Sequence, residues 1–263
     1  MKYPLFQVDA FAAELFKGNP AAVVPLPEWL DDAVLQSIAL ENNLSETAFV
    51  VPQEDAFGVR WFTPSVEVDL CGHATLAAAH VLRHHLGCNA ETIRFHTRSG
   101  ELRVTEGEFG LTLDFPARTI AAINVDVGLC DALGAVASEA FASENGSGPL
   151  LLVYEFEQDV AGLAPDFSAL QQATMSNVIV TAPGDDCDFV SRFFAPQVGI
   201  NEDPVTGSAH CNLVPYWAAR LDKTALRCRQ ISSRGGELWC QAKGDRVSIS
   251  GQAVTYLQGE ISL

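Results

Sequence analysis

The sequence predicts an α+β protein built from two related halves, residues 1–118 and 119–263. The first observation is an internal repeat, because blocks of the chain recur in the same order at a nearly constant spacing. A repeat this long indicates a duplicated domain, since solenoid repeats run to only about 20–50 residues. The second observation is that each half combines strand-like runs with one apolar, helix-like run.

Four blocks carry the repeat. They are residues 45–50 with 176–180, 60–68 with 192–200, 72–74 with 207–209, and 98–102 with 234–238. In the second block, Arg60, Phe62 and Val68 match Arg192, Phe194 and Ile200. In the first block, Glu46 meets Asn177.

In the first half, alternating or apolar runs predict strands, and Gly18-Asn19-Pro20 predicts a turn. Residues 28–43 predict a helix, because Leu30, Val34 and Ile38 fall at helical spacing after a proline. Residues 71–84 predict a second helix that is apolar nearly all round and should therefore run through the middle of its domain. The expected strands are residues 5–11, 21–25, 58–70 as a hairpin arm, 92–95, 100–105 and 111–115.

The second half repeats this order more loosely after a crossover at residues 118–126. Residues 208–221 predict its central helix, which Pro215 should kink or end. Residues 127–142 are expected to correspond to the first hairpin. The other expected elements are a helix at 166–173 and strands at 149–155, 178–182, 247–250 and 254–263.

Composition describes a globular protein with an acidic surface. The 263 residues are 48% hydrophobic and 19% charged, and the formal net charge is −17. This charge argues against nucleic-acid partners, which are bound through clustered Lys and Arg. No charged-then-apolar leader opens the chain, and no apolar run approaches the roughly 20 residues that span a bilayer, so we expect a cytoplasmic protein without a membrane partner.

The seven cysteines are odd in number, scattered, and without a CxxC pair. This pattern is typical of reduced thiols and favours neither a disulfide framework nor a zinc site. Six of them are expected to be small buried hydrophobic residues, whereas Cys71 stands out by its position at a helix start.

Two loops carry most of the chemically informative residues. Residues 69–75 (DLCGHAT) and 201–210 (NEDPVTGSAH) each follow a strand-like run and open a helix-like run. Helix N-termini bind anions through free backbone N–H groups, so Gly72 and Gly207 are expected to present donors to one ligand carboxylate.

Glu46 lies between Ser45 and the apolar run 48–51. Such a carboxylate is either an exposed residue at a strand start or a base whose pKa a dry environment raises. The repeat favours the second interpretation, because the matching residue is the neutral Asn177. A site with one central carboxyl group suits a single residue that removes and returns a proton.

No P-loop, GxGxxG after a strand, HExxH or GxSxG motif is present, so the chemistry has to come from Glu46, Cys71, His73, Asp203 and Ser208. His73 is either a satisfied core or capping residue or a ligand contact. Asp203 is either a turn residue, as the following proline suggests, or a second proton-transfer or ammonium-binding group.

Residues 43–49 (NLSETAF), 69–75 and 201–209 resemble the signature blocks of the PhzF-like isomerases, a family named for phenazine biosynthesis. Residues 6–11 (FQVDAF) and 18–21 (GNPA) resemble the family's N-terminus, so the likeness runs over essentially the whole chain.

This resemblance implies a diaminopimelate-epimerase-like fold, in which two pseudo-symmetric domains each wrap a curled, barrel-like sheet around a central helix. It also implies an active site in a cleft between the halves, a homodimer and no cofactor. Glu46 would be the general acid/base, with His73 and Asp203 as further catalytic residues. Gly72, Gly207, Ser208, Cys71 and Thr206 would bind a small carboxylate-bearing substrate. In the phenazine enzyme, that substrate is trans-2,3-dihydro-3-hydroxyanthranilate.

Two alternatives stay open. Epimerases of the same fold place one cysteine in each half, and here Cys71 resembles the first whereas the second site reads Thr206-Gly207. Cys211 lies further along, so a two-cysteine racemase is disfavoured but a racemase that uses Cys71 with another group remains possible. The other alternative is a non-catalytic protein that binds a small carboxylate.

Overall fold

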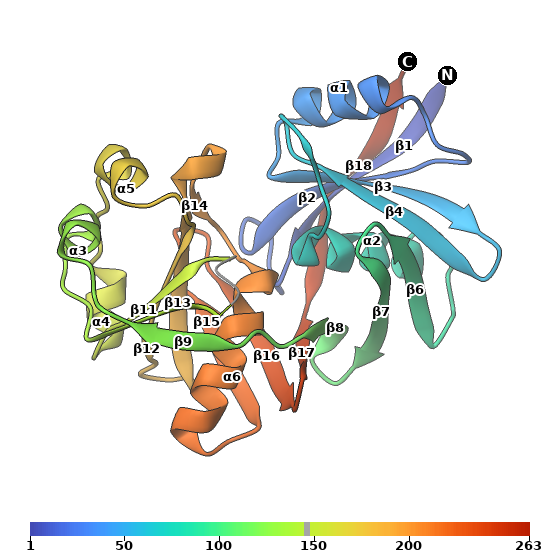
Figure 1. Cartoon of the computed structure of the whole chain (residues 1–263). Helices are drawn as coiled ribbons and strands as arrows, with labels where there is room; N and C mark the ends of the chain where they lie inside the picture. The colour runs from blue at the N-terminus through green and yellow to red at the C-terminus, as the bar shows by residue number, and fades with distance from the viewer. Residues whose placement is uncertain (145–147) are drawn as a thin grey trace. The chain divides into compact units, whose positions relative to one another are not determined.

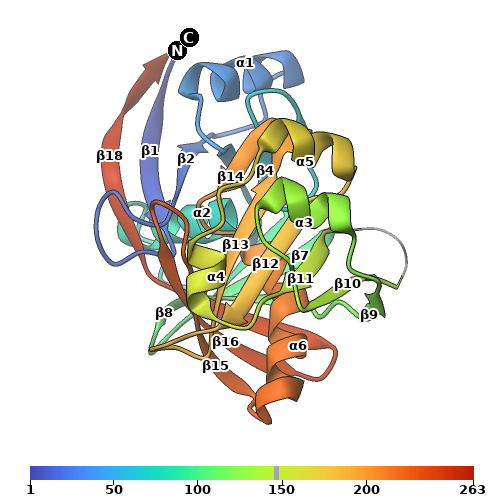
Figure 2. The ribbon, with the colours of Figure 1, turned by 90° about the vertical axis from the view of Figure 1, so that its left-hand side faces the viewer.

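The computed structural model describes residues 1–144 and 148–263, which form two compact units (Figure 1). Unit 1 is Met1–Phe115 with Ser248–Leu263, and unit 2 is Pro116–Val247. The first boundary lies close to the one expected at residue 118. The expected second half, residues 119–263, differs from unit 2 at its C-terminal end, because residues 248–263 belong to unit 1. There, β18 (Ala253–Ser262) pairs antiparallel with β1 (Lys2–Ala10) (Figure 2).

The sheet of unit 1 is mixed. β1 pairs antiparallel with β2 (Asn19–Pro25), β2 pairs parallel with β3 (Glu46–Gln53), and β3 pairs antiparallel with β4 (Ala56–Phe62). β4 contacts the short antiparallel β5 (Glu67–Val68) and, in parallel, β6 (Thr92–Thr97). β7 (Gly100–Gly107) and β8 (Gly110–Pro116) continue antiparallel. The helices are α1 (Asp32–Asn42) and α2 (Gly72–His84).

Unit 2 begins with β9 (Ile120–Ile123), α3 (Val127–Leu133), β10 (Glu139–Ser143), β11 (Leu150–Val153), α4 (Glu157–Ala161) and α5 (Phe167–Ala173). There follow β12 (Val178–Pro183), β13 (Phe189–Ala195), η1 (Pro196–Val198), β14 (Ile200–Asp203), η2 (Gly207–Ala209), α6 (His210–Leu221), β15 (Ala225–Gln230) and β16 (Gly236–Lys243). β17 (Arg246–Gly251) leads back into unit 1.

The two units share one strand connectivity. Strands β9 to β16 of unit 2 pair in the same order as strands β18 and β1 to β7 of unit 1. The parallel pair β11–β12 corresponds to β2–β3, and the parallel pair β13–β15 corresponds to β4–β6. The registers agree as well, since Phe49 stands opposite Arg60 and Val180 stands opposite Arg192. The internal repeat inferred from the sequence is therefore confirmed at the level of strand pairing.

An arginine–glutamate pair recurs at the same place in both units. The Arg60 guanidinium donates two hydrogen bonds of 2.7 Å to Glu67, and Arg192 donates bonds of 2.7 and 3.0 Å to Glu202. Each guanidinium also lies over the phenylalanine two residues later, about 5 Å from the ring centre. Because each guanidinium binds one carboxylate through two hydrogen bonds, the pairs hold the short strands β5 and β14 against β4 and β13. These short strands lead into the loops at residues 69–75 and 201–210.

These pairs correct the sequence alignment at one point. Glu67 stands opposite Phe62 and Glu202 stands opposite Phe194, so Val68 corresponds to Asp203 and not to Ile200. The extra residues of unit 2 form η1, which lies before β14 and explains the slip in register.

α2 is the central helix of unit 1, as its composition predicted. It is buried on nearly every side, and its run of alanines lets β1, β2 and β3 approach closely. α1 covers the opposite face of these strands (Figure 1), where Leu35 and Ile38 pack with Val24, Phe49 and Phe62. The start of α2 is thereby held rigidly beside the starts of β2 and β3.

α6 is the central helix of unit 2. The sequence predicted that Pro215 would kink or end this helix, and the prediction of an end at Pro215 was wrong. The helix continues to Leu221. Pro215 cannot donate to the carbonyl of Cys211 one turn earlier. That carbonyl instead accepts a hydrogen bond of 2.9 Å from the backbone N–H of Arg118, so the crossover segment replaces the missing partner.

Two local expectations also differ in detail. The helix expected from residue 28 begins at Asp32, although it ends as predicted, with Asn43 in the left-handed region at φ 49°. Residues 127–142 begin with a helix, α3, before β10 takes the place equivalent to β1. No helix among the described residues is long and apolar enough to cross a membrane.

We predict that stability falls as pH is lowered from about 6.5 to 4 because of His210. This side chain is fully buried, its Nδ1–H donates to the carbonyl of Thr206 at 3.0 Å, and burial lowers its pKa to about 4. The unfolded chain binds a proton near pH 6.5 and the folded chain does not, so acid favours unfolding by up to about 3 kcal/mol.

Urea unfolding at pH 7 and pH 5 measures this difference. His210→Gln should reduce the pH dependence, and part of it should remain because burial also lowers the pKa of His80 to about 4. His96→Gln at an exposed site of unit 1 should leave the pH dependence unchanged. An unchanged slope in His210→Gln would show that other groups cause the acid sensitivity.

Candidate active site

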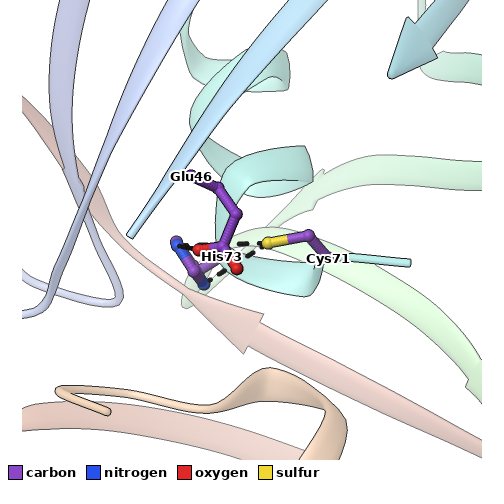
Figure 3. A group of neighbouring side chains, drawn as sticks. All are labelled: Glu46, Cys71 and His73. Atoms are coloured by element: carbon purple, nitrogen blue, oxygen red, sulfur yellow. Dashed lines mark hydrogen bonds and ion pairs between the residues drawn. The ribbon is translucent and has the colours of Figure 1, made fainter. Parts of the chain in front are cut away.

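The starts of β2, β3 and α2 bring three predicted site residues together in unit 1 (Figure 3). Glu46 is the first residue of β3 and stands opposite Ala21 of β2. Cys71 caps α2 in an extended conformation, and His73 lies in the first helical turn. Because a parallel strand pair and a helix start meet here, side chains distant in sequence share one buried corner.

The imidazole of His73 lies at the centre of this cluster. Its Nε2 is 3.0 Å from Oε2 of Glu46, and its Nδ1 is 3.2 Å from the amide of Asn19 and 3.6 Å from Sγ of Cys71. The His73 side chain is 6% exposed and that of Glu46 is 13% exposed. Glu46 is thus nearly enclosed, which excludes the exposed strand-start interpretation.

The charges of the cluster follow from these contacts. Burial opposes a charged imidazole, but the neighbouring acidic groups of Cys71 and Glu46 outweigh it and raise the pKa of His73 well above 6.5. Burial, reinforced by the charge of Glu46, raises the pKa of the Cys71 thiol. At neutral pH this describes a neutral thiol beside a protonated His73 that forms an ion pair with Glu46.

The first turn of α2 lies where the sequence predicted a helix start. α2 begins at Gly72, and the first N–H groups of a helix have no partner within it. Thr75 closes the turn by donating from Oγ1 to the carbonyl of Cys71 at 2.5 Å. In unit 2, Gly207 opens the 3-10 turn η2, and α6 begins only at His210. The second helix start is therefore a tighter turn than expected.

The loop of unit 2 holds the other predicted residues, Asp203, Thr206, Gly207 and Ser208. Asp203 ends β14, and Oγ1 of Thr206 donates to its Oδ2 at 2.5 Å. Asp203, Thr206 and Gly207 are buried, whereas Ser208 is partly exposed. Asp203 is therefore more than a surface turn residue, because its carboxylate is buried and bonded.

Gln230 is a residue of this loop that sequence reasoning missed. Its side chain is 1% exposed, accepts from the backbone N–H of Thr206 at 2.8 Å, and donates to the carbonyl of Asp203 at 2.8 Å. Ser232 donates to the carbonyl of Pro204 at 2.7 Å. The end of β15 and the turn after it therefore fix the backbone of residues 203–206.

Asn19 was also missed as a site residue. The sequence marked it only as part of a turn, and its contact with His73 depends on β2 reaching the start of α2. Gln230 carried no local signal, because a single glutamine at a strand end has no distinctive pattern.

Glu46, Cys71 and His73 are also the one group of described residues with metal-ligand geometry, since their ligand atoms all lie within 4.8 Å of one another. Apart from metal binding, the cluster can move protons. A carboxylate next to a cationic imidazole can accept and return a proton, and the helix start can bind a substrate anion.

Comparisons with known proteins agree with this fold. The family model described as "Phenazine biosynthesis-like protein" matches residues 8–259. An uncharacterized isomerase of Pseudomonas aeruginosa is 52% identical over the full length of both chains. A PhzF-family crystal structure from Enterococcus faecalis is 50% identical, covers all of both chains and has a TM-score of 0.96.

A more distant structure, titled a predicted epimerase from Pseudomonas aeruginosa, is 22% identical, covers 98% of this chain and 99% of its own, and superposes with a TM-score of 0.75. It shows the same fold. The duplicated fold thus places the chain in the class of proteins with a PhzF-like or epimerase-like fold. The chain belongs to the phenazine biosynthesis-like (PhzF) family and is an enzyme of the isomerase type.

We predict that Gln230→Ala destabilises unit 2 by about 2 kcal/mol, because it leaves the buried N–H of Thr206 and the carbonyl of Asp203 without their partners. Gln241→Ala is the matched control, since Gln241 is exposed on the adjacent strand β16. Urea denaturation measures both variants. Equal stability of the Gln230→Ala and Gln241→Ala variants would contradict the role of Gln230 in holding the backbone of residues 203–206.

Proposed function

We propose that the enzyme is a cofactor-independent isomerase that moves a proton by general acid/base catalysis on a small carboxylate-bearing substrate. Glu46 carries the proton. The observation that supports this role most directly is the 3.0 Å contact between the nearly buried Glu46 carboxylate and His73.

In this proposal, His73 influences the reaction through its contact with Glu46 and by contacting the substrate. The protonated imidazole forms an ion pair with the Glu46 carboxylate and holds it in place, and the carboxylate removes a proton from carbon. When Glu46 has taken that proton, the same carboxyl group can deliver it to a second carbon. One titratable group with a fixed partner is sufficient for this sequence.

The remaining predicted residues bind the substrate. The backbone N–H groups at Gly72 and Gly207 bind the substrate carboxylate. The Asp203 carboxylate is a further catalytic residue that contacts the substrate but does not carry the proton that Glu46 moves between carbons. Ser208 and Thr206 add hydroxyl contacts, and Cys71 packs against the substrate.

A racemase that uses Cys71 is the second candidate function. A catalytic cysteine attacks a proton as the thiolate, but the raised pKa of Cys71 keeps it as a thiol at neutral pH. The residue that corresponds to Cys71 in unit 2 is Thr206, which cannot serve as a second thiol base. The proton-shift isomerase is therefore favoured.

Deuterium exchange in D₂O, followed by NMR, tests the proposal. The substrates are dihydro-hydroxyanthranilate and a panel of amino acids and hydroxy acids. We predict that Glu46→Gln lowers exchange into a C–H bond by at least about 100-fold, because the general base is lost. Cys71→Ser should retain most of the exchange.

The reverse pattern, with exchange lost in Cys71→Ser and kept in Glu46→Gln, would establish the racemase. Tight binding of a small carboxylate with no exchange on any compound would instead favour the non-catalytic alternative. We also propose that the enzyme works as a cytoplasmic homodimer, which sedimentation of the purified protein and cell fractionation test.

A further inference from the structure

We propose that Glu46, Cys71 and His73 form a binding site for a thiophilic divalent cation such as Zn²⁺. Binding would occupy the proton-carrying carboxylate and inhibit the enzyme, and this inhibitory consequence rests on the function proposed above. The sequence favoured no zinc site, because the usual cysteine spacing is absent. The three ligands come instead from the start of β3 and the start of α2.

The distances between the ligand atoms fit a tetrahedral ion. Nε2 of His73 lies 3.0 Å from Oε2 of Glu46 and 4.0 Å from Sγ of Cys71. Zinc bonds of about 2.0–2.3 Å in tetrahedral geometry place such atoms roughly 3.3–3.6 Å apart. All three ligand atoms lie within 4.8 Å of one another, so side-chain shifts within the cluster create three coordination positions. A fourth position is left for water or an anion.

The donor set selects the kind of cation. One thiol sulfur, one imidazole nitrogen and one carboxylate oxygen suit Zn²⁺ and Co²⁺, whereas Mg²⁺ and Ca²⁺ prefer oxygen ligands alone. Among the described residues, no other group of three ligands meets the same distance criterion. The cluster is thus the place in the described chain where a thiophilic ion has three ligands.

Asn19 supplies the outer contact that a histidine ligand needs. A ligating imidazole binds the metal with one nitrogen and makes a hydrogen bond with the other. The Asn19 amide lies 3.2 Å from Nδ1, which leaves Nε2 directed toward Glu46. An asparagine amide can turn to present its oxygen, so it can accept the Nδ1–H of a zinc-bound ring.

Binding displaces protons in a defined way. The Cys71 S–H bond breaks, a sulfur–metal bond forms, and the proton leaves to solvent, while protonated His73 also releases its Nε2 proton. No electron is transferred. Because protons and the metal compete for the same ligand atoms, the apparent affinity should rise with pH.

Titration of the metal-free, full-length protein with Co²⁺ tests the site by absorption. We expect a near-ultraviolet thiolate-to-cobalt charge-transfer band that saturates at one ion per chain and is lost on addition of excess Zn²⁺. Cys71→Ser should abolish the band. His73→Gln and Glu46→Gln should weaken Co²⁺ binding about tenfold or more, as loss of a ligand requires.

Two matched variants control for other sites. Cys211→Ser removes a buried cysteine outside the cluster, and His84→Gln breaks the His80–His84 pair that lies one turn apart on α2. Both should keep the band. A band that persists in Cys71→Ser, or no band in the wild type, would overturn the proposal.

The metal proposal and the proposed function fail separately. Co²⁺ binding is measured without substrate, so its absence leaves Glu46-dependent deuterium exchange untouched. Conversely, binding without any exchange activity would leave the metal site standing while the function fails. Inhibition of deuterium exchange by Zn²⁺ that a chelator reverses would connect the metal site with the proposed function. In Cys71→Ser, the Zn²⁺ concentration needed for this inhibition should rise at least tenfold. Exchange that stays uninhibited when the site is saturated would overturn the inhibitory role.

Discussion

The contact between Glu46 and His73 is the interaction on which the site depends. A carboxylate buried without a partner would neutralise or be expelled, because taking a charge out of water costs several kcal/mol. The imidazole at 3.0 Å offsets this cost and is itself held by the Asn19 amide. Since both groups lie at the starts of regular elements, the Glu46 carboxylate has a fixed place and a fixed partner.

The duplicated scaffold shows how one framework carries different chemistry in its two copies. Both units keep the forked arginine–glutamate pair and the helix start after the short strand. At that start, unit 1 has Cys71 and His73 where unit 2 has Thr206 and Ser208. The loop of unit 1 therefore carries titratable side chains, and the loop of unit 2 carries hydroxyl groups and a buried aspartate at the end of β14.

Much of the fold and of the site residues was predictable, because the signals are local or repeated. The repeat required two similar units, and alanines on all sides of residues 71–84 required a central helix. The grouping of Glu46 with Cys71 and His73 was harder to foresee, because it depends on the parallel pairing of β2 with β3.

Other features depend on contacts that leave no sequence pattern. Pro215 was expected to disrupt its helix, but the N–H of Arg118 binds the carbonyl that the proline leaves free. Gln230 lies at the end of a strand, and only the folded loop reveals the two backbone groups that it binds. The pairing of β18 with β1 joins the two ends of the chain, so no local rule predicts it.

The most direct test of a single carrier at Glu46 is a single-turnover experiment with substrate deuterated at the carbon that loses its hydrogen. One carboxyl group that removes and returns the same proton predicts that part of the product carries deuterium at the new carbon, even in ordinary water. Product whose new hydrogen comes wholly from water, even at the earliest times, would contradict the transfer of one and the same proton by Glu46.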